Sequence, residues 1–528
     1  MKTVVRPFSL ALICLALAAC GGGDSRNSIE STVGGGSVAG GGDLSQGGSG
    51  SETPGGGTGQ STALANMCAS PRTGTDPATG AAYTDRPGTL ENEKSWVRAW
   101  IDETYLWYDE VPTSLKASDY ATPQAYFDVL KTPATTASGA PKDRFHYFLD
   151  TAAFQGDVAG TGSVGYGMEV AMLNALPPRD IRVAYVVPGS PAAAQGIVRG
   201  DRLIAMDGTD VGTGSADPLN AALFPTTAGE SHSMVVTSNA GATRTVTLTA
   251  AVVASDPVMN VSTIPTAAGP VGYMQFNDHN ELAETELVAA IEELKSKNVV
   301  GLVLDMRYNG GGLLGIAAEL GYMIAGPGPT QGKTFERLVT NRKNPYGMTE
   351  EEANFPFQAT AVGYSMTAGG ALPNLGLSKV TVLSGPDTCS ASESLVNSLR
   401  GVGIQVDLIG GTTCGKPYGF FPTDNCGTTY LAINFQGVND KGFGDYGDGM
   451  APTCTVADDF GHQLGDVNEA RLAAALSFSA TGICPAPSSS SGGSVLRKST
   501  GTLVEGPYLR RNPLRENKRI DALLRPKT

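Results

Sequence analysis

Ser390 and Lys416 are the residues of this sequence with the clearest potential for covalent chemistry. Ser390 follows an apolar run and a tight turn, and Lys416 stands in a glycine-bearing loop. A serine hydroxyl attacks a carbonyl carbon readily when a neighbouring base takes its proton, and a lysine is such a base if burial lowers its pKa toward neutrality. The sequence therefore predicts a nucleophile–base pair that transfers an acyl group.

The segments around this pair alternate between strand and helix patterns. Residues 380–383 and 406–409 are apolar runs typical of buried strands, and the leucines of residues 391–401 recur at helical spacing. A serine at the start of such a helix lies near free backbone N–H groups, which favour negative charge. Residues 298–324 repeat the succession of strand and helix. We therefore predict an α/β domain with its functional loops at the carboxyl ends of the strands.

Ser390 also has a structural interpretation. Together with Glu393 it spells S-x-x-E, the capping box in which a serine closes the first turn of a helix. The four histidines show no Ser/His/Asp context, so the sequence favours a lysine base over a histidine triad. The cysteines show no C-x2-C spacing and there are only four histidines, so we expect no metal ion. We expect no other cofactor either.

Length and charge narrow the class of protein. With 528 residues the chain is long enough for two or three domains, and it has apolar residues enough to build their cores. A nucleic-acid binder carries a basic stripe, whereas this chain has a net charge of −14. We therefore expect no nucleic-acid partner.

The N-terminal residues indicate where in the cell the protein acts. Lys2 and Arg6 precede an apolar run, residues 8–19, that is too short to span a bilayer. The run ends in L-A-A-C, which resembles the lipobox of bacterial lipoproteins. The resemblance implies cleavage before Cys20 and lipidation of its thiol, which would anchor the chain in the bacterial cell envelope. We expect the anchor to lie in the outer membrane and the chain to face the periplasm.

Six further cysteines follow: Cys68, Cys389, Cys414, Cys426, Cys454 and Cys484. An even number of cysteines in an oxidising compartment indicates disulfide bonds. Cys389 and Cys414 flank the two candidate catalytic residues, and we predict a bond between them that ties the serine turn to the lysine loop. The pairing of the other four stays open.

Residues 160–257 change to short strands separated by turns. The run V-G-Y-G-M-E-V, followed by P-G-S-P-A-A-A-Q-G and by G-D-R-L-I-A-M-D-G, resembles a PDZ domain of the bacterial protease type. This resemblance implies that Gly165, Tyr166 and Gly167 bind the C-terminal carboxylate of a ligand, whose peptide then adds as a strand to the sheet edge. The alternative is a PDZ-shaped spacer whose groove is unused.

Four features resemble the C-terminal-processing (tail-specific) serine peptidases in content and order. They are D-R-F at 143–145, the PDZ-like segment, L-V-L-D-M-R-Y-N-G-G-G at 302–312, and S-A-S-E at 390–393 with G-K at 415–416. The resemblance implies a ClpP/crotonase-like core in which Ser390 is the nucleophile, Lys416 the general base, and the amides of Gly311 and Ala391 the oxyanion hole. Relatives often carry a Gln or Asp near the dyad, but those positions are Phe420 and Arg400 or Gly401 here, so no third catalytic residue is assigned.

The patterns predict a multi-domain α/β protein. Its segments are a signal peptide (1–19), a flexible Gly/Ser-rich tether (20–87), a small helical N-terminal region (88–155) that packs on the core, a PDZ-like β-rich domain (156–257), a peptidase core (258–484) and a disordered basic tail (485–528).

The predicted function is that of a lipid-anchored serine endopeptidase that cleaves proteins near their C-termini. The expected partners are protein or peptide substrates with free C-termini, captured by the PDZ-like domain, and the membrane through the lipid anchor; whether an activator protein takes part stays open. The alternative is a catalytically inactive lipoprotein scaffold that binds peptides through its PDZ-like domain.

Overall fold

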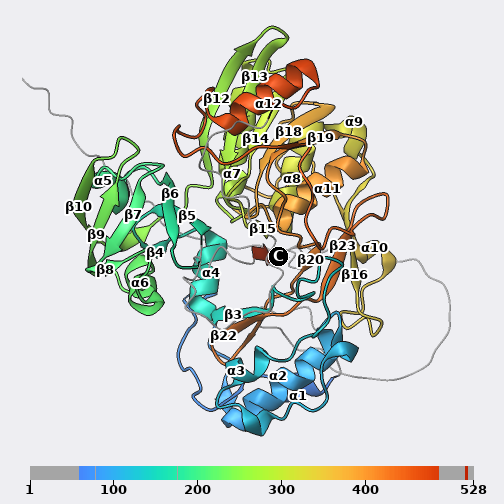
Figure 1. Cartoon of the computed structure of the whole chain (residues 1–528). Helices are drawn as coiled ribbons and strands as arrows, with labels where there is room; N and C mark the ends of the chain where they lie inside the picture. Colours follow the sequence, from blue (N-terminus) through green and yellow to red (C-terminus); the bar gives the residue numbers. More distant parts are fainter. Residues whose placement is uncertain (1–58, 78, 175, 487–517, 521–528) are drawn as a thin grey trace, which may run out of the picture. The chain divides into compact units, whose positions relative to one another are not determined.

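The computed structural model describes residues 59–77, 79–174 and 176–486, together with the strand 518–520 (Figure 1). The predicted signal peptide, Cys20 and the first part of the predicted tether lie outside the described residues. The described residues all belong to one structural unit, Ser51–Thr528. Among them, no helix combines the length and the apolar character that a membrane crossing requires.

A six-stranded sheet forms the centre of the core domain. Its strands, in spatial order, are β12 (Val258–Thr266), β13 (Gly269–Phe276), β14 (Gly301–Asp305), β18 (Lys379–Ser384), β19 (Gln405–Gly410) and β24 (Cys454–Thr455). Figure 1 labels the first five of these strands in the upper part of the molecule. Only the β12–β13 pair is antiparallel; the other neighbours run parallel. Parallel strands need helical crossovers, so both faces of the sheet become covered.

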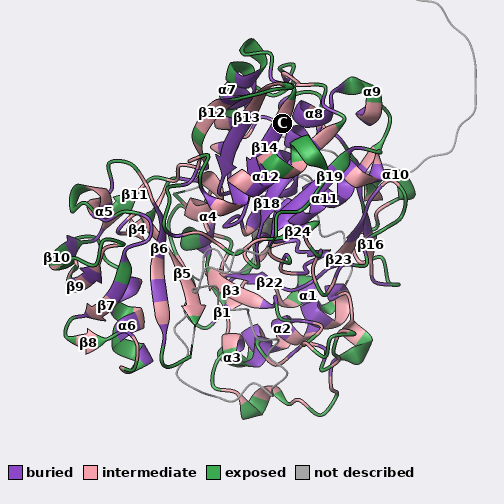
Figure 2. Ribbon diagram, turned by 45° about the horizontal axis from the view of Figure 1, so that its top comes forward, coloured by how far each residue is buried: buried purple, intermediate pink, exposed green. Residues whose placement is uncertain are grey.

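Helices cover both faces of this sheet. They are α7 (Ala283–Ser296), α8 (Leu314–Ala325) and α11 (Ala391–Gly401) on one face and α12 (Ala470–Thr481) on the other. Alternate residues of β14 point to opposite faces of the sheet. Leu302 and Leu304 belong to the hydrophobic cluster that includes α7, α8 and α11, and Val303 belongs to the cluster with Leu472 of α12. Figure 2 shows buried residues concentrated in β14, β18, β19 and α11. This burial on both faces explains why the strands are continuously apolar, and the predicted α/β core is confirmed.

Smaller sheets border the core. One contains β17 (Asn354–Pro356), β16 (Thr334–Thr340), β23 (Phe435–Val438) and β20 (Tyr418–Gly419); another contains β21 (Thr423–Asn425), β22 (Thr428–Leu431) and β3 (Tyr147–Asp150). The short helices α9 (Pro327–Thr330) and α10 (Glu350–Ala353) lie in the connections. Because β3 comes from the N-terminal region and β22 from the core, their pairing attaches that region to the core, as predicted.

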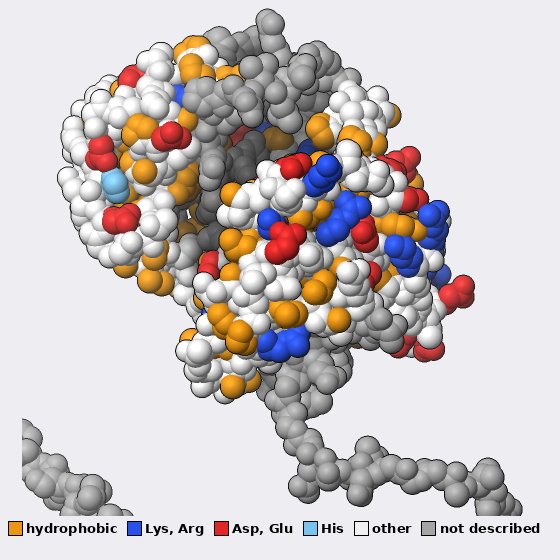
Figure 3. Space-filling view, turned by 90° about the horizontal axis from the view of Figure 1, so that it is seen from below, with side chains coloured by type: hydrophobic (Ala, Val, Ile, Leu, Met, Phe, Trp, Pro, Cys, Tyr) orange, Lys and Arg blue, Asp and Glu red, His pale blue; other side chains and the backbone are white. Residues whose placement is uncertain are grey.

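The N-terminal region is mostly helical. Its elements are α1 (Gln60–Leu64), β1 (Met67–Cys68), β2 (Arg86–Pro87), α2 (Leu90–Thr104), η1 (Tyr108–Glu110), η2 (Ala117–Asp119), α3 (Pro123–Phe127) and α4 (Thr151–Ala159). A capping box of Thr89 and Asn92 begins α2, and its Trp96 and Trp100 pack against Tyr430 of the core. Acidic and basic side chains are intermixed on the face that Figure 3 presents.

The predicted tether ends earlier than residue 87. Residues 60–64 form α1, and Cys68 is bonded to Cys426. The prediction extended a compositional bias that is strong only in the preceding glycine-rich run, whereas a disulfide and a two-strand pairing hold the later residues.

The PDZ-like domain has its own core. Its main sheet has the order β10 (Thr243–Thr249), β9 (Ser231–Thr237), β7 (Arg202–Met206), β6 (Asp180–Val186) and β5 (Met168–Asn174), with β8 (Thr209–Asp210) paired to β7. A second pair joins β4 (Ser163–Gly165) to β11 (Ala251–Val253), and two helices, α5 (Pro191–Ala194) and α6 (Ala216–Leu223), complete the domain. Because β5 lies at the end of the main sheet, its outer edge can accept a further strand.

The prediction of a fully disordered tail is wrong for three residues. Residues 518–520 form β25 (Lys518–Ile520), which pairs in parallel with β15 (Gly311–Leu313). Residues 487–517 and 521–528 lie outside the described residues. The prediction relied on the absence of an apolar periodicity, but a strand that adds to an existing edge is held by backbone hydrogen bonds and needs no such pattern.

Candidate active site

Ser390 lies at the strand–turn–helix junction that the sequence predicted. It follows β18 and directly precedes α11, and its side chain is completely buried. Its backbone has φ 59° and ψ −117°, a left-handed conformation that is costly for a residue with a Cβ. The hydroxyl oxygen has no hydrogen-bond partner of normal geometry among the described residues. A strained, buried and unpartnered hydroxyl points to a chemical rather than a capping role.

Lys416 is completely buried as well, in the loop that follows β19. Its Nζ lies 3.9 Å from the ring centroid of Phe420 and 5.4 Å from that of Phe145. Desolvation lowers the pKa of Lys416 well below its usual value, and the opposing attraction of Asp143 and Glu393 is weaker. The amine therefore has the environment that a neutral lysine base requires.

Glu393 joins the serine turn to the lysine loop. Its Oε2 accepts hydrogen bonds from the amides of Ser390 at 3.0 Å and Lys416 at 2.8 Å. Its Oε1 accepts from the amide of Gly415 at 2.8 Å and from the hydroxyl of Thr413. Since one carboxylate oxygen binds both amides, the main chains of Ser390 and Lys416 are held next to each other. The sequence indicated only the helix-capping part of this role.

A disulfide bond between Cys389 and Cys414 supplements the carboxylate and confirms the predicted pairing. Cys389 immediately precedes the candidate nucleophile, and Cys414 lies two residues before Lys416. The two loops are therefore joined covalently as well as through Glu393. The remaining cysteines form Cys68–Cys426 and Cys454–Cys484, which the sequence had left open.

The loop after β14 does not present the Gly311 amide that was predicted as an oxyanion donor. The amide of Gly311 donates to Oδ1 of Asn309 at 2.9 Å, so in this conformation it is not free to bind an oxyanion. The carbonyl of Asn309 accepts from the amide of Cys389 and from the hydroxyl of Ser392, which fixes this loop against the serine turn. Within the described part of the chain, the amides of Gly310 and Ala391 donate to no acceptor. The donor pair of this conformation is therefore Gly310 and Ala391.

Asp143 is the functional candidate that the sequence did not assign. Its carboxylate accepts from the hydroxyl of Tyr105 at 2.6 Å and from the amides of Phe145 and His146. Burial acts to raise the pKa of Asp143, but His146 and Tyr105 outweigh it and hold that pKa below its usual value. The resulting negative charge acts on Lys416 through space and favours its protonated form. The D-R-F segment at 143–145 was the sequence feature that pointed to Asp143. Its long separation in sequence from Lys416 meant that the electrostatic interaction between the two residues could not be predicted.

Comparison with known proteins agrees with this arrangement. Residues 270–433 match the family model of peptidase family S41, residues 92–147 match the peptidase S41 N-terminal domain, and residues 182–237 match a PDZ domain. The chain carries a peptidase S41 domain.

Relatives with curated descriptions are similar over part of this S41 chain. It is 29% identical over 234 residues to the carboxyl-terminal-processing peptidase 2, chloroplastic, of Arabidopsis thaliana. The matched stretch covers 42% of this chain and 44% of that relative. It is 31% identical over 265 residues to the C-terminal processing peptidase, chloroplastic, of Tetradesmus obliquus. Here the matched stretch covers 48% of this chain and 53% of the relative. The chain thus spans about half the length of the curated relatives it matches.

A solved structure shows the same fold as this S41 chain. The crystal structure described as a putative S41 protease from Bacteroides fragilis superposes with a TM-score of 0.57 at 23% identity, and covers 73% of this chain and 97% of that chain. At this identity the likeness shows the fold alone.

The PDZ loop of the S41 chain has the features that a carboxylate site needs. Gly167 has φ 71°, and a Cβ there would lie 2.2 Å from the Cβ of Ser190, so only glycine fits. The carbonyls of Tyr166 and Gly167 accept from the amides of Ala192 and Val187, whereas the amides of Tyr166 and Gly167 have no acceptor in the described residues. That Gly165, Tyr166 and Gly167 bind a peptide carboxylate stays a prediction.

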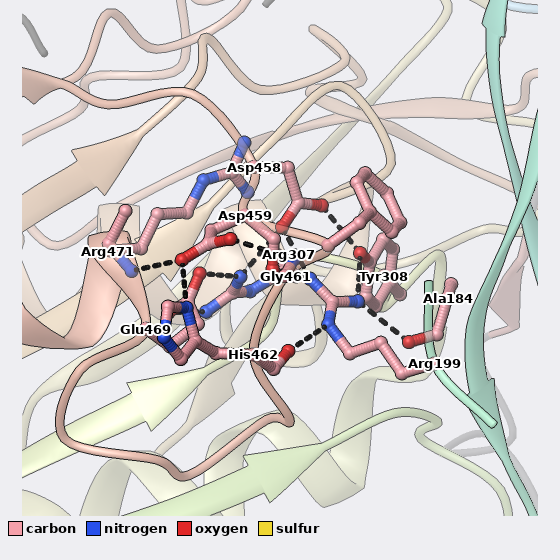
Figure 4. A network of polar contacts seen from close by, with 12 residues as sticks. Ala184, Arg199, Arg307, Tyr308, Asp458, Asp459, Gly461, His462, Glu469 and Arg471 are labelled. Carbon is pink, nitrogen blue, oxygen red and sulfur yellow. Dashed lines mark hydrogen bonds and ion pairs between the residues drawn. The ribbon is translucent and has the colours of Figure 1, made fainter. Parts of the chain in front are cut away.

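A buried polar network connects the PDZ domain to the core (Figure 4). Arg199 of the PDZ domain donates to the carbonyl of Ala184 at 2.6 Å, to the hydroxyl of Tyr308 at 2.7 Å and to Oδ1 of Asp458 at 2.7 Å. Asp458 also binds the hydroxyl of Tyr308 and, at 2.8 Å, the guanidinium of Arg307. Tyr308 precedes Asn309 in the chain, so the PDZ domain is joined to the loop that carries the candidate oxyanion donor Gly310.

We expect Arg199→Met to weaken this connection. The variant leaves Asp458 and the hydroxyl of Tyr308 buried with fewer partners, and breaking a buried ion pair typically costs about 3–5 kcal/mol. Denaturant unfolding and kcat/KM for a peptide substrate measure the effect, and both should fall. The control is Arg202→Met, which removes a half-exposed PDZ arginine paired with Asp180. Equal unfolding midpoints for the two variants would contradict a linking role for Arg199.

Proposed function

We propose that this chain is a serine endopeptidase in which Ser390 attacks the peptide carbonyl and Lys416 acts as the general base. The observation that carries the proposal is the convergence of the Ser390 and Lys416 amides on one oxygen of Glu393, beside a buried amine with a lowered pKa. A nucleophile and a base held in this way, in a site without exposed side-chain surface, suit acyl transfer.

The proposed reaction proceeds in two stages. Ser390 Oγ forms a bond to the carbonyl carbon as its proton passes to neutral Lys416, and the amides of Ala391 and Gly310 stabilise the oxyanion. The C–N bond then breaks, and protonated Lys416 gives its proton to the leaving amine. A water molecule next attacks the acyl-enzyme while Lys416 takes its proton, which releases the carboxylate product and restores the Ser390 hydroxyl.

The proposed substrates are proteins cleaved near their C-termini. The descriptions of the relatives as carboxyl-terminal-processing enzymes support this class. The free amides of the Tyr166–Gly167 loop and the open edge of β5 would allow the PDZ domain to hold a substrate tail. We further propose that Cys20 is lipidated and that the enzyme acts in the bacterial cell envelope, which rests on the L-A-A-C sequence.

The test combines covalent labelling with a cleavage assay. A fluorophosphonate probe should modify one serine, identified as Ser390 by peptide mass spectrometry, and an unstructured polypeptide with a free C-terminus should be cut. The Ser390→Ala variant should lose labelling and cleavage. Ser392→Ala serves as the control and should still be labelled at Ser390, since Ser392 donates to the Asn309 carbonyl and holds no reactive position. Binding of the polypeptide without cleavage or labelling would instead identify a peptide-binding scaffold.

A further inference from the structure

The chain's own C-terminal segment lies beside the candidate active site. Lys518, Arg519 and Ile520 pair in parallel with Gly311, Gly312 and Leu313, so β25 extends β15 into a two-stranded sheet. Figure 1 shows this short dark-red strand next to β15. On another side β25 also lies against β20.

Both neighbours of β25 carry parts of the catalytic machinery. β15 directly follows the loop of Asn309 and Gly310, whose carbonyl at Asn309 is bonded to the serine turn. β20 begins two residues after Lys416. A segment that touches β15 and β20 at once therefore lies between the chain segments that carry the oxyanion donor and the base.

Gly312 is the residue of β15 that can bond to the added strand. The amide and carbonyl of Gly311 already bond to Asn309 and His279, and the amide of Leu313 donates to the His279 carbonyl. In a parallel ladder, one residue bonds to the two residues that flank its partner. The partner of Gly312 is Arg519, so the ladder runs from Gly312 to the carbonyl of Lys518 and the amide of Ile520.

We propose that β15 is the edge that receives a substrate strand and that residues 518–520 occupy it, so that the chain inhibits itself. The proposal rests on the proposed peptidase function, because it concerns regulation of the same site. It agrees with the burial of Ser390 and Lys416, whose side chains have no exposed surface in this state. A substrate strand can pair with Gly312 only after β25 has left.

The attachment of the tail to the core favours its competition with a substrate strand for the edge of β15. The Cys454–Cys484 bond fixes the start of the tail to β24, the edge strand of the central sheet. Residues 485–517 separate this bond from β25, and a tether of about this length gives its end an effective concentration on the order of mM. Residues 485–528 contain nine Lys and Arg against three Asp and Glu, while the whole chain has a net charge of −14. Opposite charges therefore add to the attraction between tail and body.

The test breaks the ladder in the full-length protein. Ile520→Pro removes the amide that donates to Gly312, so it should lower KM for a peptide substrate by about tenfold or more and leave kcat unchanged. Thr502→Pro places the same residue in the tail outside β25 and should leave both constants at the wild-type values. A synthetic peptide of residues 511–528 should inhibit the Ile520→Pro variant competitively. Equal KM values for wild type and Ile520→Pro, or a KM that rises with enzyme concentration, would overturn inhibition within one chain.

A binding experiment separates this inference from the proposed function. A fluorescent peptide of residues 511–528 is titrated into Ser390→Ala and into the Ser390→Ala, Ile520→Pro double variant. Neither protein turns over, so the result does not depend on catalysis. The double variant should bind the peptide about tenfold more tightly or better. Equal affinities would refute the occupation of β15 by the tail, whatever the outcome of the labelling experiment.

Discussion

Lys416→Met is expected to lower kcat/KM for a peptide substrate by about 10²–10⁴-fold, the usual contribution of a general base. The same variant should be more stable than the wild type at neutral pH. The folded chain binds a proton at Lys416 more weakly than the unfolded chain does, because burial lowers the folded-state pKa well below 10.5. Burying this amine therefore costs free energy at neutral pH, and methionine removes the cost without leaving a cavity.

Steady-state kinetics and thermal unfolding measure these opposite changes. The matched control is Lys379→Met, which removes a lysine that is about one-third exposed at the start of β18 and pairs with Asp407 of β19. This control should keep its activity, because a surface ion pair contributes little. A Lys416→Met enzyme with wild-type kcat/KM would exclude Lys416 as the base.

The same pKa shift predicts the pH dependence. The base must be neutral, so kcat/KM should rise with pH through the pKa of Lys416 and level off above it. Since that pKa lies well below 10.5, the midpoint of the rise in kcat/KM should also lie well below pH 10.5. The stability cost of the buried amine should shrink as pH rises toward the unfolded-state pKa of about 10.4.

Glu393→Gln is expected to impair both stability and catalysis. A carboxamide offers one acceptor oxygen, whereas the carboxylate of Glu393 serves the amides of Ser390, Gly415 and Lys416 as well as the hydroxyl of Thr413. Each buried donor that loses its acceptor costs about 1–3 kcal/mol. We expect a loss of several kcal/mol in the free energy of unfolding and a fall in kcat/KM, because the serine turn and the lysine loop lose their common acceptor.

Glu352→Gln is the matched control. Glu352 forms the same kind of capping box with Thr349 at the start of α10, but on the surface. Its replacement should change the free energy of unfolding by less than about 1 kcal/mol. Urea unfolding of both variants, with the Cys389–Cys414 bond intact, makes the comparison. If the two variants lost equal stability, Glu393 would be a helix cap and no more.

Local patterns made much of the site predictable. Ser390 stands at a strand–turn–helix junction, a short-range feature that apolar runs and helical spacing reveal. Lys416 followed from the glycine-bearing loop and its spacing from Ser390, and the Cys389–Cys414 bond followed because each cysteine stands within two residues of a candidate catalytic residue. The parallel core was predictable since β14 and β18 are buried on both faces and therefore continuously apolar.

Long-range contacts explain what was missed. The bonds from Glu393 to Gly415 and Lys416 span more than twenty residues, and sequence spacing shows only the bond to Ser390. The candidate oxyanion donor is Gly310 and not the predicted Gly311, because the Gly311 amide donates to the Asn309 side chain, a contact that sequence spacing does not reveal. Strand β25 has the sequence K-R-I and therefore no run of apolar residues, and a strand can add to the edge of β15 through backbone hydrogen bonds without one.

The Cys68–Cys426 bond has a mechanical consequence. It joins β1 to the turn between β21 and β22, across 358 residues of sequence. If the N-terminus is held at a membrane, as proposed, tension passes through this sulfur bridge directly into a core hairpin, and the enclosed stretch carries no load. Single-molecule stretching should therefore yield a much shorter extension for the oxidised chain than for the reduced one. The bridge would thus protect the catalytic body from forces acting on its anchor.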